Sequence, residues 1–440
     1  MTGGVSATSG RGLKMGRTRV FFLLVLFSGS IFLLVALGCA GSGSQTTSMN
    51  PAPPSGGGSG NGGSGSGSGG SGGGGNGGGG GNGGGGGGNT PASASRFIFG
   101  GPGFETGSVQ AGTINSANGA VSAVAGSPFD EGMGQSNLLQ ITADTKGRFV
   151  YVLNIAAFGA GMKIGDAGLC GFAINRQTGA LSRVPGSPVT FSTSNDNQIA
   201  VDGTGHFLFE PNGQNGSAGA GFDVYSIDQS SGALTKTSSG SNAPPVGSFS
   251  VADAAGHFIF NAGNGLVEAF TIDSISGQLA ATGAPMATAG SAGPLAISAD
   301  GKFLYVANQK EGTLAIFSVG TSGTITPVTG LPFTIDSEPQ YLALTPDGKF
   351  LYIAVFNGSS GGSVKGFAVN PSGGTVVPIS GAVINGATTV TVDLSGKFAY
   401  ISSVGKLTTY SIDPTTGALT PMSTTNAPSS DNPNDMVTVM

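Results

Sequence analysis

The chain has 440 residues, of which 84 are glycine and only 9% are charged, and its formal net charge is −5. Beyond residue 19 the chain holds 13 Lys and Arg against 22 Asp and Glu and has no basic cluster, which argues against a nucleic-acid-binding surface. Two cysteines, Cys39 and Cys170, are too few for a disulfide framework. A hydrophobic core therefore has to stabilise the fold.

Residues 1–38 are predicted to be a targeting segment, because a basic start without acidic residues precedes an apolar stretch over residues 20–37. The stretch ends in ALGC at Cys39, which resembles the lipobox of bacterial lipoproteins, with Ala36 where Leu is usual. The resemblance implies a cleaved signal peptide, lipidation of Cys39 and a lipid anchor in the bacterial cell envelope, at the outer membrane or cell surface. An uncleaved membrane anchor is the alternative, since a stretch of this length can just span a bilayer. Either Met1 or Met15 could be the start.

Residues 39–95 are predicted to be a disordered tether. Residues 41–95 carry no charge, and residues 55–89 contain only Gly, Ser and Asn. Such a segment cannot bury enough apolar area to offset the entropy of ordering. As a random coil, it would have an end-to-end distance of about 40 Å.

The rest of the chain, residues 96–440, is built on a repeat. Six aspartates each stand just before a Gly, a residue that is usually basic, a Phe and an apolar run, as in DGKFLYVAN. A fixed period of nearly 50 residues is typical of solenoids, propellers and arrays. The aspartates are Asp144, Asp202, Asp253, Asp300, Asp347 and Asp393, at intervals of 58, 51, 47, 47 and 46 residues.

Each repeat contains four short β-type segments. The unit from Gly293 to Phe333 reads PLAISAD, FLYVAN, TLAIFSV and TITPV, separated by turns rich in Gly, Asp and Asn. β-Branched and aromatic residues are enriched in these segments, and none shows a sustained helical period. Four antiparallel strands per repeat are the pattern of a propeller blade.

The number of repeats predicts seven blades. Six complete units run from Asn137 to about Pro428. Before them lies a unit that lacks its first strand, beginning RFIFGG at Arg96, and after them a single strand, DMVTVM, begins at Asp435. Pairing these pieces would complete a blade and hide exposed sheet edges. We therefore predict an all-β, seven-bladed β-propeller of four-stranded antiparallel blades, closed by the C-terminal strand pairing with the N-terminal blade.

The repeated phrases PDGKFLYIA and ADGKFLYVAN, the TGALT-type turns and the GSPF sequence at residues 126–129 resemble the lactonase-like seven-bladed propellers. That family includes 6-phosphogluconolactonase-type proteins, carboxymuconate cyclases and YVTN-repeat surface proteins. The resemblance covers nearly all of residues 96–440. Because fold does not fix function, it implies the architecture more strongly than an activity.

Enzymatic members of the family resemble one another in placing Arg and His at the start of the inner strands, often as Pro-Arg-His. The matching stretches here carry neither residue; for example, Gly293 and Glu338 are followed by Pro-Leu and Pro-Gln. His206 and His257 occupy a slot that Lys fills in sister repeats, which favours a solvated rim position. We therefore assign no catalytic residue. No cofactor is expected, and no His/Cys pair has the spacing of metal ligands.

A set of polar residues remains where the inner strands are predicted to begin, at the mouth of the central channel. Their oxygen and amide groups could bind a small polar ligand or a cation, although such groups can also simply stay hydrated. The aspartates of the repeat are expected to cap turns, and Cys170 is expected to be a buried thiol. The channel-mouth residues are Asn137, Asp196, Asn197, Glu338, Gln340 and Asp435.

The sequence thus favours a lipid-anchored, extracytoplasmic propeller that acts as a non-catalytic binding or interaction module. The expected partners are the membrane, through the lipid on Cys39, and a protein, glycan or small polar ligand. No nucleic acid is expected, and the protein is expected to be a monomer. The alternatives are a lactone hydrolase or cycloisomerase, 6-phosphogluconolactonase-like with a diverged active site, and a structural spacer without a ligand.

Overall fold

The structure is a computed structural model, and the chain in it divides into two compact units, Met1–Asn89 and Thr90–Met440. In the first unit, β1 (Leu23–Phe27) and β2 (Ser30–Leu34) pair antiparallel. Cys39 and the predicted tether lie outside the described residues. The described part of the chain has no helix with the length and apolarity that a membrane crossing requires. It comprises residues 23–27, 30–34, 97–101, 107–133, 136–156, 167–191, 198–212, 221–238, 247–328, 332–335, 338–356, 362–403, 406–426 and 436–440.

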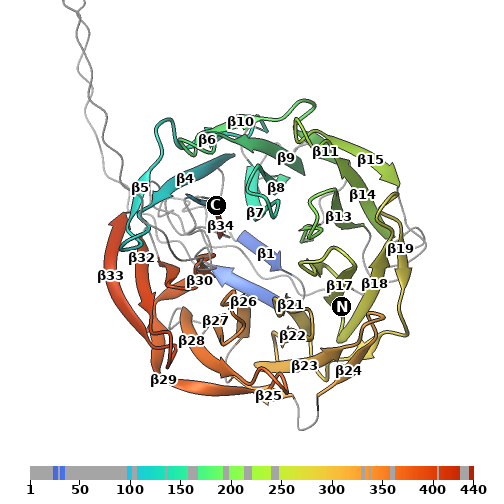
Figure 1. Cartoon of the computed structure of the whole chain (residues 1–440), viewed down its shortest axis with the longest axis vertical. Coiled ribbons are helices and arrows are strands. Elements are labelled where there is room, and N and C mark those ends of the chain that lie inside the picture. The colour runs from blue at the N-terminus through green and yellow to red at the C-terminus, as the bar shows by residue number, and fades with distance from the viewer. Residues whose placement is uncertain are drawn as a thin grey trace, which may run out of the picture. The chain divides into compact units, whose positions relative to one another are not determined.

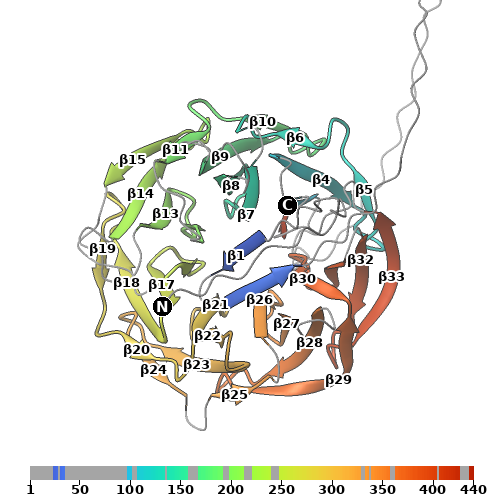
Figure 2. The same cartoon turned by 180° about the vertical axis from the view of Figure 1, so that it is seen from behind.

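The second unit is a ring of seven antiparallel sheets, which confirms the predicted seven-bladed propeller (Figure 1). Six blades use consecutive strands, with the first strand at the centre of the ring and the fourth at its periphery, as both views show (Figure 2). Blade 2 is β7 (Ser136–Ala143), β8 (Phe149–Ala156), β9 (Ala167–Ile174) and β10 (Leu181–Arg183); blade 3 is β12 (Ala200–Val201), β13 (Phe207–Asn212), β14 (Gly221–Ile227) and β15 (Leu234–Ser238); blade 4 is β16 (Phe249–Ala252), β17 (Phe258–Gly263), β18 (Leu266–Ile272) and β19 (Leu279–Ala281). Blade 5 is β21 (Ala292–Ile297), β22 (Phe303–Asn308), β23 (Thr313–Val319) and β24 (Ile325–Pro327); blade 6 is β26 (Glu338–Leu344), β27 (Phe350–Phe356), β28 (Gly362–Val369) and β29 (Val376–Asn385); blade 7 is β30 (Ala387–Val392), β31 (Phe398–Ser403), β32 (Lys406–Ile412) and β33 (Leu419–Asn426).

Blade 1 closes the ring, and it joins the two ends of the propeller as the sequence predicted. Its strand order is β34 (Met436–Val439), β3 (Phe97–Gly100), β4 (Ser108–Ile114) and β5 (Val121–Ala123). The register pairs Phe97 with Val439 and Gly100 with Met436. Because β34 is paired in this way, the first strand of blade 1 comes from the opposite end of the propeller sequence.

Four short strands were not predicted. β6 (Phe129–Asp130), β11 (Val189–Phe191), β20 (Met286–Ala287) and β25 (Phe333–Thr334) each pair with the third strand of their own blade. In blade 2, for example, β10 and β11 both pair with β9, and Pro185 and Pro188 lie between them. Proline cannot donate a ladder hydrogen bond, so a peripheral strand interrupted there resumes as a separate short strand.

Neighbouring blades contact each other through a glycine and a phenylalanine. A Cβ added to Gly277 of blade 4 would lie 2.6 Å from the Phe207 ring of blade 3, and one added to Gly119 of blade 1 would lie 2.7 Å from Phe398 of blade 7. The TGAL-type turn of one blade therefore packs on the Phe of the DGKF-type turn in the blade before it. All seven glycines have positive φ; the pairs are Phe97/Gly179, Phe149/Gly232, Phe207/Gly277, Phe258/Gly323, Phe303/Gly374, Phe350/Gly417 and Phe398/Gly119.

Aspartates cap the turn between the first and second strands, as predicted, but only four of the six do so in the same way. Asp144 Oδ1 accepts the backbone N–H groups of Arg148 and Phe149, at 2.5 and 2.9 Å. Asp202, Asp253 and Asp393 accept the corresponding bonds. In blades 5 and 6 the hydroxyls of Ser298 and Thr345 take this position, whereas Asp300 and Asp347 are exposed and lie two residues further on.

Candidate functional site

The channel mouth is the end of the ring where the first strand of each blade begins. Two of the six predicted mouth residues can be described there: Glu338 and Gln340 lie at the start of β26 and are both half-buried. For Asn137 only the backbone is described, in β7. The other three, Asp196, Asn197 and Asp435, lie outside the described residues. The predicted set is therefore represented here by one carboxylate and one amide.

Gln309 of blade 5 joins Gln340 of blade 6 at the mouth. Its side-chain Nε2 donates to Gln340 Oε1 at 3.3 Å, and its backbone N–H donates to the Ser291 carbonyl at 2.9 Å. Gly293 lies against the side chain, and a Cβ added there would be 2.7 Å from Gln309. A larger residue at position 293 would displace Gln309, so this glycine helps to hold the amide pair.

Glu311 fixes the adjoining loop of blade 5. Its carboxylate accepts the backbone N–H of Ser291 at 2.5 Å and the Ser291 hydroxyl at 3.2 Å. The mouth cluster therefore consists of Ser291, Gln309 and Glu311 from blade 5 together with Glu338 and Gln340 from blade 6. Its polar groups are two amides, two carboxylates and one hydroxyl, a set that provides many acceptors and several donors.

The sequence did not reveal Gln309 and Glu311 as site residues, because they lie in a short polar loop between two predicted strands, FLYVAN and TLAIFSV, and match no motif. The position of the loop could have identified these residues, because the loop directly follows Asn308 at the end of a second strand. Since second strands end where first strands begin, such a loop has to border the channel mouth.

The described arginines and histidines lie away from the mouth. Arg148 stands at the other end of β7 and β8, where its Nε lies 2.7 Å from Asp144 Oδ2. His206 is exposed at the equivalent turn of blade 3, with Nδ1 3.0 Å from Thr204 Oγ1. Arg183 lies on the peripheral strand β10. These arginine and histidine side chains are thus spread over the turns and the periphery and do not converge on one ligand.

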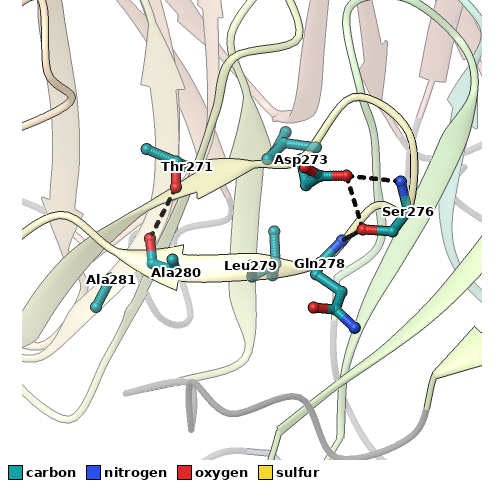
Figure 3. A pocket seen from close by; sticks show the side chains of 8 residues that line it. Thr271, Asp273, Ser276, Gln278, Leu279, Ala280 and Ala281 are labelled. Carbon is teal, nitrogen blue, oxygen red and sulfur yellow. Dashed lines mark hydrogen bonds between the residues drawn. The ribbon is translucent and has the colours of Figure 1, made fainter.

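The hollow in Figure 3 belongs to a single hairpin of blade 4, formed by β18 and β19. Asp273 accepts hydrogen bonds from the backbone N–H and the hydroxyl of Ser276, at 2.8 and 2.7 Å, as the dashed lines show. These bonds favour the carboxylate and lower the pKa of Asp273. Asp273 is therefore a turn cap, and the hollow lacks the convergent polar groups of a ligand site.

The buried thiol predicted at position 170 is confirmed. Cys170 is fully buried in β9, and its Sγ donates to the Glu131 carbonyl at 3.2 Å. Burial raises the pKa of the thiol to about 12, because a thiolate would lose its hydration. A thiol of that kind is a core residue and a poor nucleophile.

Seven antiparallel blades, four of which carry an additional short strand, form a ring closed by a sheet that both ends of the propeller sequence share. The class of the fold is therefore a seven-bladed β-propeller. Within it, residues 256–392 match the family model described as "Lactonase, 7-bladed beta-propeller". The resemblance drawn from the repeats is thereby confirmed over this part of the chain, and the architecture is that of a seven-bladed propeller. Among curated proteins, none matches the sequence.

Solved structures of similar fold include two bacterial proteins. The periplasmic gluconolactonase of Pseudomonas aeruginosa is 18% identical, with a TM-score of 0.61 over 79% of this chain and 99% of its own. A candidate 6-phosphogluconolactonase from Bacteroides uniformis is also 18% identical, with a TM-score of 0.60 over 78% of this chain and 99% of its own. At this identity the likeness establishes the fold alone.

Proposed function

We propose that this protein is a non-catalytic binding module, anchored by lipid outside the cytoplasmic membrane, whose mouth cluster binds a neutral, hydroxyl-rich ligand such as a glycan. The observation that carries the proposal is the hydrogen-bonded pair Gln309–Gln340, held between two blades beside Glu338. Amide side chains donate and accept, and a carboxylate accepts, so this set complements ligand hydroxyl groups.

The charges of the mouth cluster favour a neutral ligand over a phosphorylated one. A phosphate or sugar-acid group is best held by Arg or Lys side chains. Glu311 and Glu338 bring negative charge to the mouth, and Arg148 is engaged with Asp144 at the opposite end of blade 2. Lys310 is exposed in the loop between Gln309 and Glu311, and one such cation is a weak anion site.

Replacing Gln340 with alanine should weaken binding of a neutral oligosaccharide by about tenfold, because the ligand and Gln309 would both lose a hydrogen-bonding partner. The measurement is calorimetric titration of the full chain with a panel of neutral oligosaccharides. Gln278→Ala, which removes an exposed glutamine from the blade 4 hairpin, is the matched control. Equal affinity of both variants, or binding of anionic sugars alone, would contradict the proposed ligand class.

Lactone hydrolysis is the second candidate, and the structural likeness to gluconolactonases is the observation that favours it. Of the two described carboxylates at the mouth, Glu311 accepts hydrogen bonds from Ser291, so Glu338 would be the acidic group of that reaction. An assay of the full chain against a panel of sugar lactones decides between the two functions. Turnover that disappears in Glu338→Gln would replace the binding proposal, whereas ligand binding without turnover would support it.

Lipid attachment at Cys39 should make the protein incorporate labelled fatty acid in a bacterial host. The basic start, the apolar stretch and the ALGC sequence support this proposal. The label should disappear in Cys39→Ala and persist in Cys170→Ala, which removes the buried core thiol. Label that persists in Cys39→Ala would exclude lipidation at this cysteine, whereas wild-type protein without label would favour an uncleaved apolar anchor.

A further inference from the structure

Blade 3 carries two opposed acidic side chains at a position where blade 2 has Val152 and Cys170 and blade 4 has Asn261 and Glu268. Glu210 of β13 stands directly opposite Asp223 of β14 in the register of the hairpin. Directly opposed residues have Cβ atoms about 5 Å apart, and their side chains leave the same face of the sheet. Both residues are buried, with exposed fractions of 4% and 5%. The equivalent pair in blade 5 is Val306 and Ala315, so the fold does not require acids at this position.

The hydrogen bonds available on blade 3 leave part of each carboxyl group unpaired. Lys236 Nζ lies 2.5 Å from Asp223 Oδ2, and the Tyr225 hydroxyl donates to the Glu210 carboxyl. Glu210 Oε2 and Asp223 Oδ1 are buried without a hydrogen-bond partner. Leaving a buried oxygen unpaired costs about 1–3 kcal/mol, and more when the group is charged. Two such oxygens from opposed residues therefore indicate a missing donor.

Among the residues that the structure describes, the facing blade supplies no such donor. This side of blade 3 packs against blade 2, where the cluster around Tyr225 includes Tyr151, Leu153 and Leu169. The Tyr151 hydroxyl already donates to the Gly232 carbonyl at 2.9 Å. Within the described residues, no three side chains of the metal-ligating type lie together, and Lys236 already provides a positive charge. Protonation of one of the two carboxyl groups would pair both oxygens, because its O–H could donate to the other carboxylate.

We propose that Glu210 and Asp223 form a proton-binding site between blades 2 and 3, in which protonated Glu210 donates its O–H to Asp223 Oδ1. The shared proton leaves one negative charge on the pair, and Lys236 balances it. Loss of the proton places two opposed carboxylates at a packed interface between blades. The contact between blades 2 and 3 is therefore strongest when the site is protonated.

The electrostatics of the site agree with this assignment. Burial, reinforced by the charge of Asp223, raises the pKa of Glu210 from 4.5 to about 8, and Lys236 and Tyr225 oppose the rise. The folded chain thus binds the proton more tightly than the unfolded chain, whose Glu210 titrates near 4.5. Stability should consequently fall as the pH rises from 4.5 to 8 and level off above that range.

The test is denaturant unfolding of the full chain across this pH range. In wild type, Glu210 should lower the folding equilibrium constant by up to about tenfold for each pH unit. In Glu210→Gln, which keeps a donor at this position, that contribution should vanish. Asp300→Asn is the control and should keep the wild-type slope: burial works against ionisation of Asp300, yet hydrogen bonds from Ser298 and Lys302 bring its pKa below the ordinary value. A wild-type slope that survives in Glu210→Gln overturns the proposal.

Infrared spectroscopy of the unaltered protein provides an independent measurement if the variant does not fold. The carboxylic-acid C=O band of Glu210 should persist at neutral pH and titrate away with a midpoint near 8. In Asp223→Asn the midpoint should fall, because the neighbouring negative charge is gone. The absence of a carboxylic-acid band at neutral pH, or an unchanged midpoint in Asp223→Asn, would overturn the shared proton.

Discussion

Removal of residues 436–440 should abolish cooperative folding of the propeller. The deletion takes away β34, and with it Met436 and Val439, which are only 7% and 2% exposed. Thr438, between them, donates to the Val392 carbonyl of blade 7 at 3.1 Å. Each buried apolar side chain contributes about 1.5–3 kcal/mol, so with the lost ladder bonds the total approaches the whole stability of a typical domain, about 5–15 kcal/mol. Thermal unfolding followed by circular dichroism measures the loss.

A peptide of residues 432–440, added in trans, serves as the complement to this deletion. An added strand can restore a sheet through main-chain hydrogen bonds, so the peptide should recover the cooperative transition of the shortened chain. A peptide with Val439→Asp should fail, because Val439 pairs with Phe97 and packs in the core shared with blade 2. A shortened chain that melts at the wild-type temperature would show that ring closure contributes little.

Most of the fold could be predicted because each blade repeats the same pattern of four short strands and similar turn sequences. The apolar run of residues 435–440 resembles the other first strands, so the closure could be inferred without coordinates. Alignment by aspartate was correct in four blades and shifted by two residues in blades 5 and 6. In these two blades the hydroxyls of Ser298 and Thr345 accept the turn-capping hydrogen bonds. Asp300 and Asp347 lie two residues later and do not occupy the capping position. A hydroxyl and a carboxylate both accept a backbone N–H, so the motif alone could not distinguish them.

The candidate site was less predictable because its contacts cross between blades. Gln309 meets Gln340 only because the ring brings a loop of blade 5 beside the first strand of blade 6. Likewise, Glu210 and Asp223 become opposed through the register of their hairpin, which the sequence between them does not reveal. Side chains with these properties are visible in the sequence, but their partners depend on tertiary geometry.

Replacing Gly277 with alanine should destabilise the propeller by about 2–5 kcal/mol. Its φ of 70° lies in the left-handed region, where a Cβ costs about 1–2 kcal/mol. The new Cβ would also lie 2.6 Å from the ring of Phe207, which is only 5% exposed. Such overpacking adds about 1–3 kcal/mol. Equilibrium unfolding in denaturant measures the difference from wild type.

Gly348→Ala separates the two causes, because Gly348 has the same φ of 70° and nothing within 4 Å of an added Cβ. This variant should lose only the stability that a Cβ costs at positive φ, about 1–2 kcal/mol. Phe207→Leu in the Gly277→Ala chain should then recover part of the difference, since the smaller side chain leaves room for the methyl group. Equal losses of stability in the two alanine variants would mean that the Phe207 ring moves aside without an energetic penalty. The seven glycine–phenylalanine contacts would then follow from turn geometry alone, and their contribution to holding neighbouring blades together would be small.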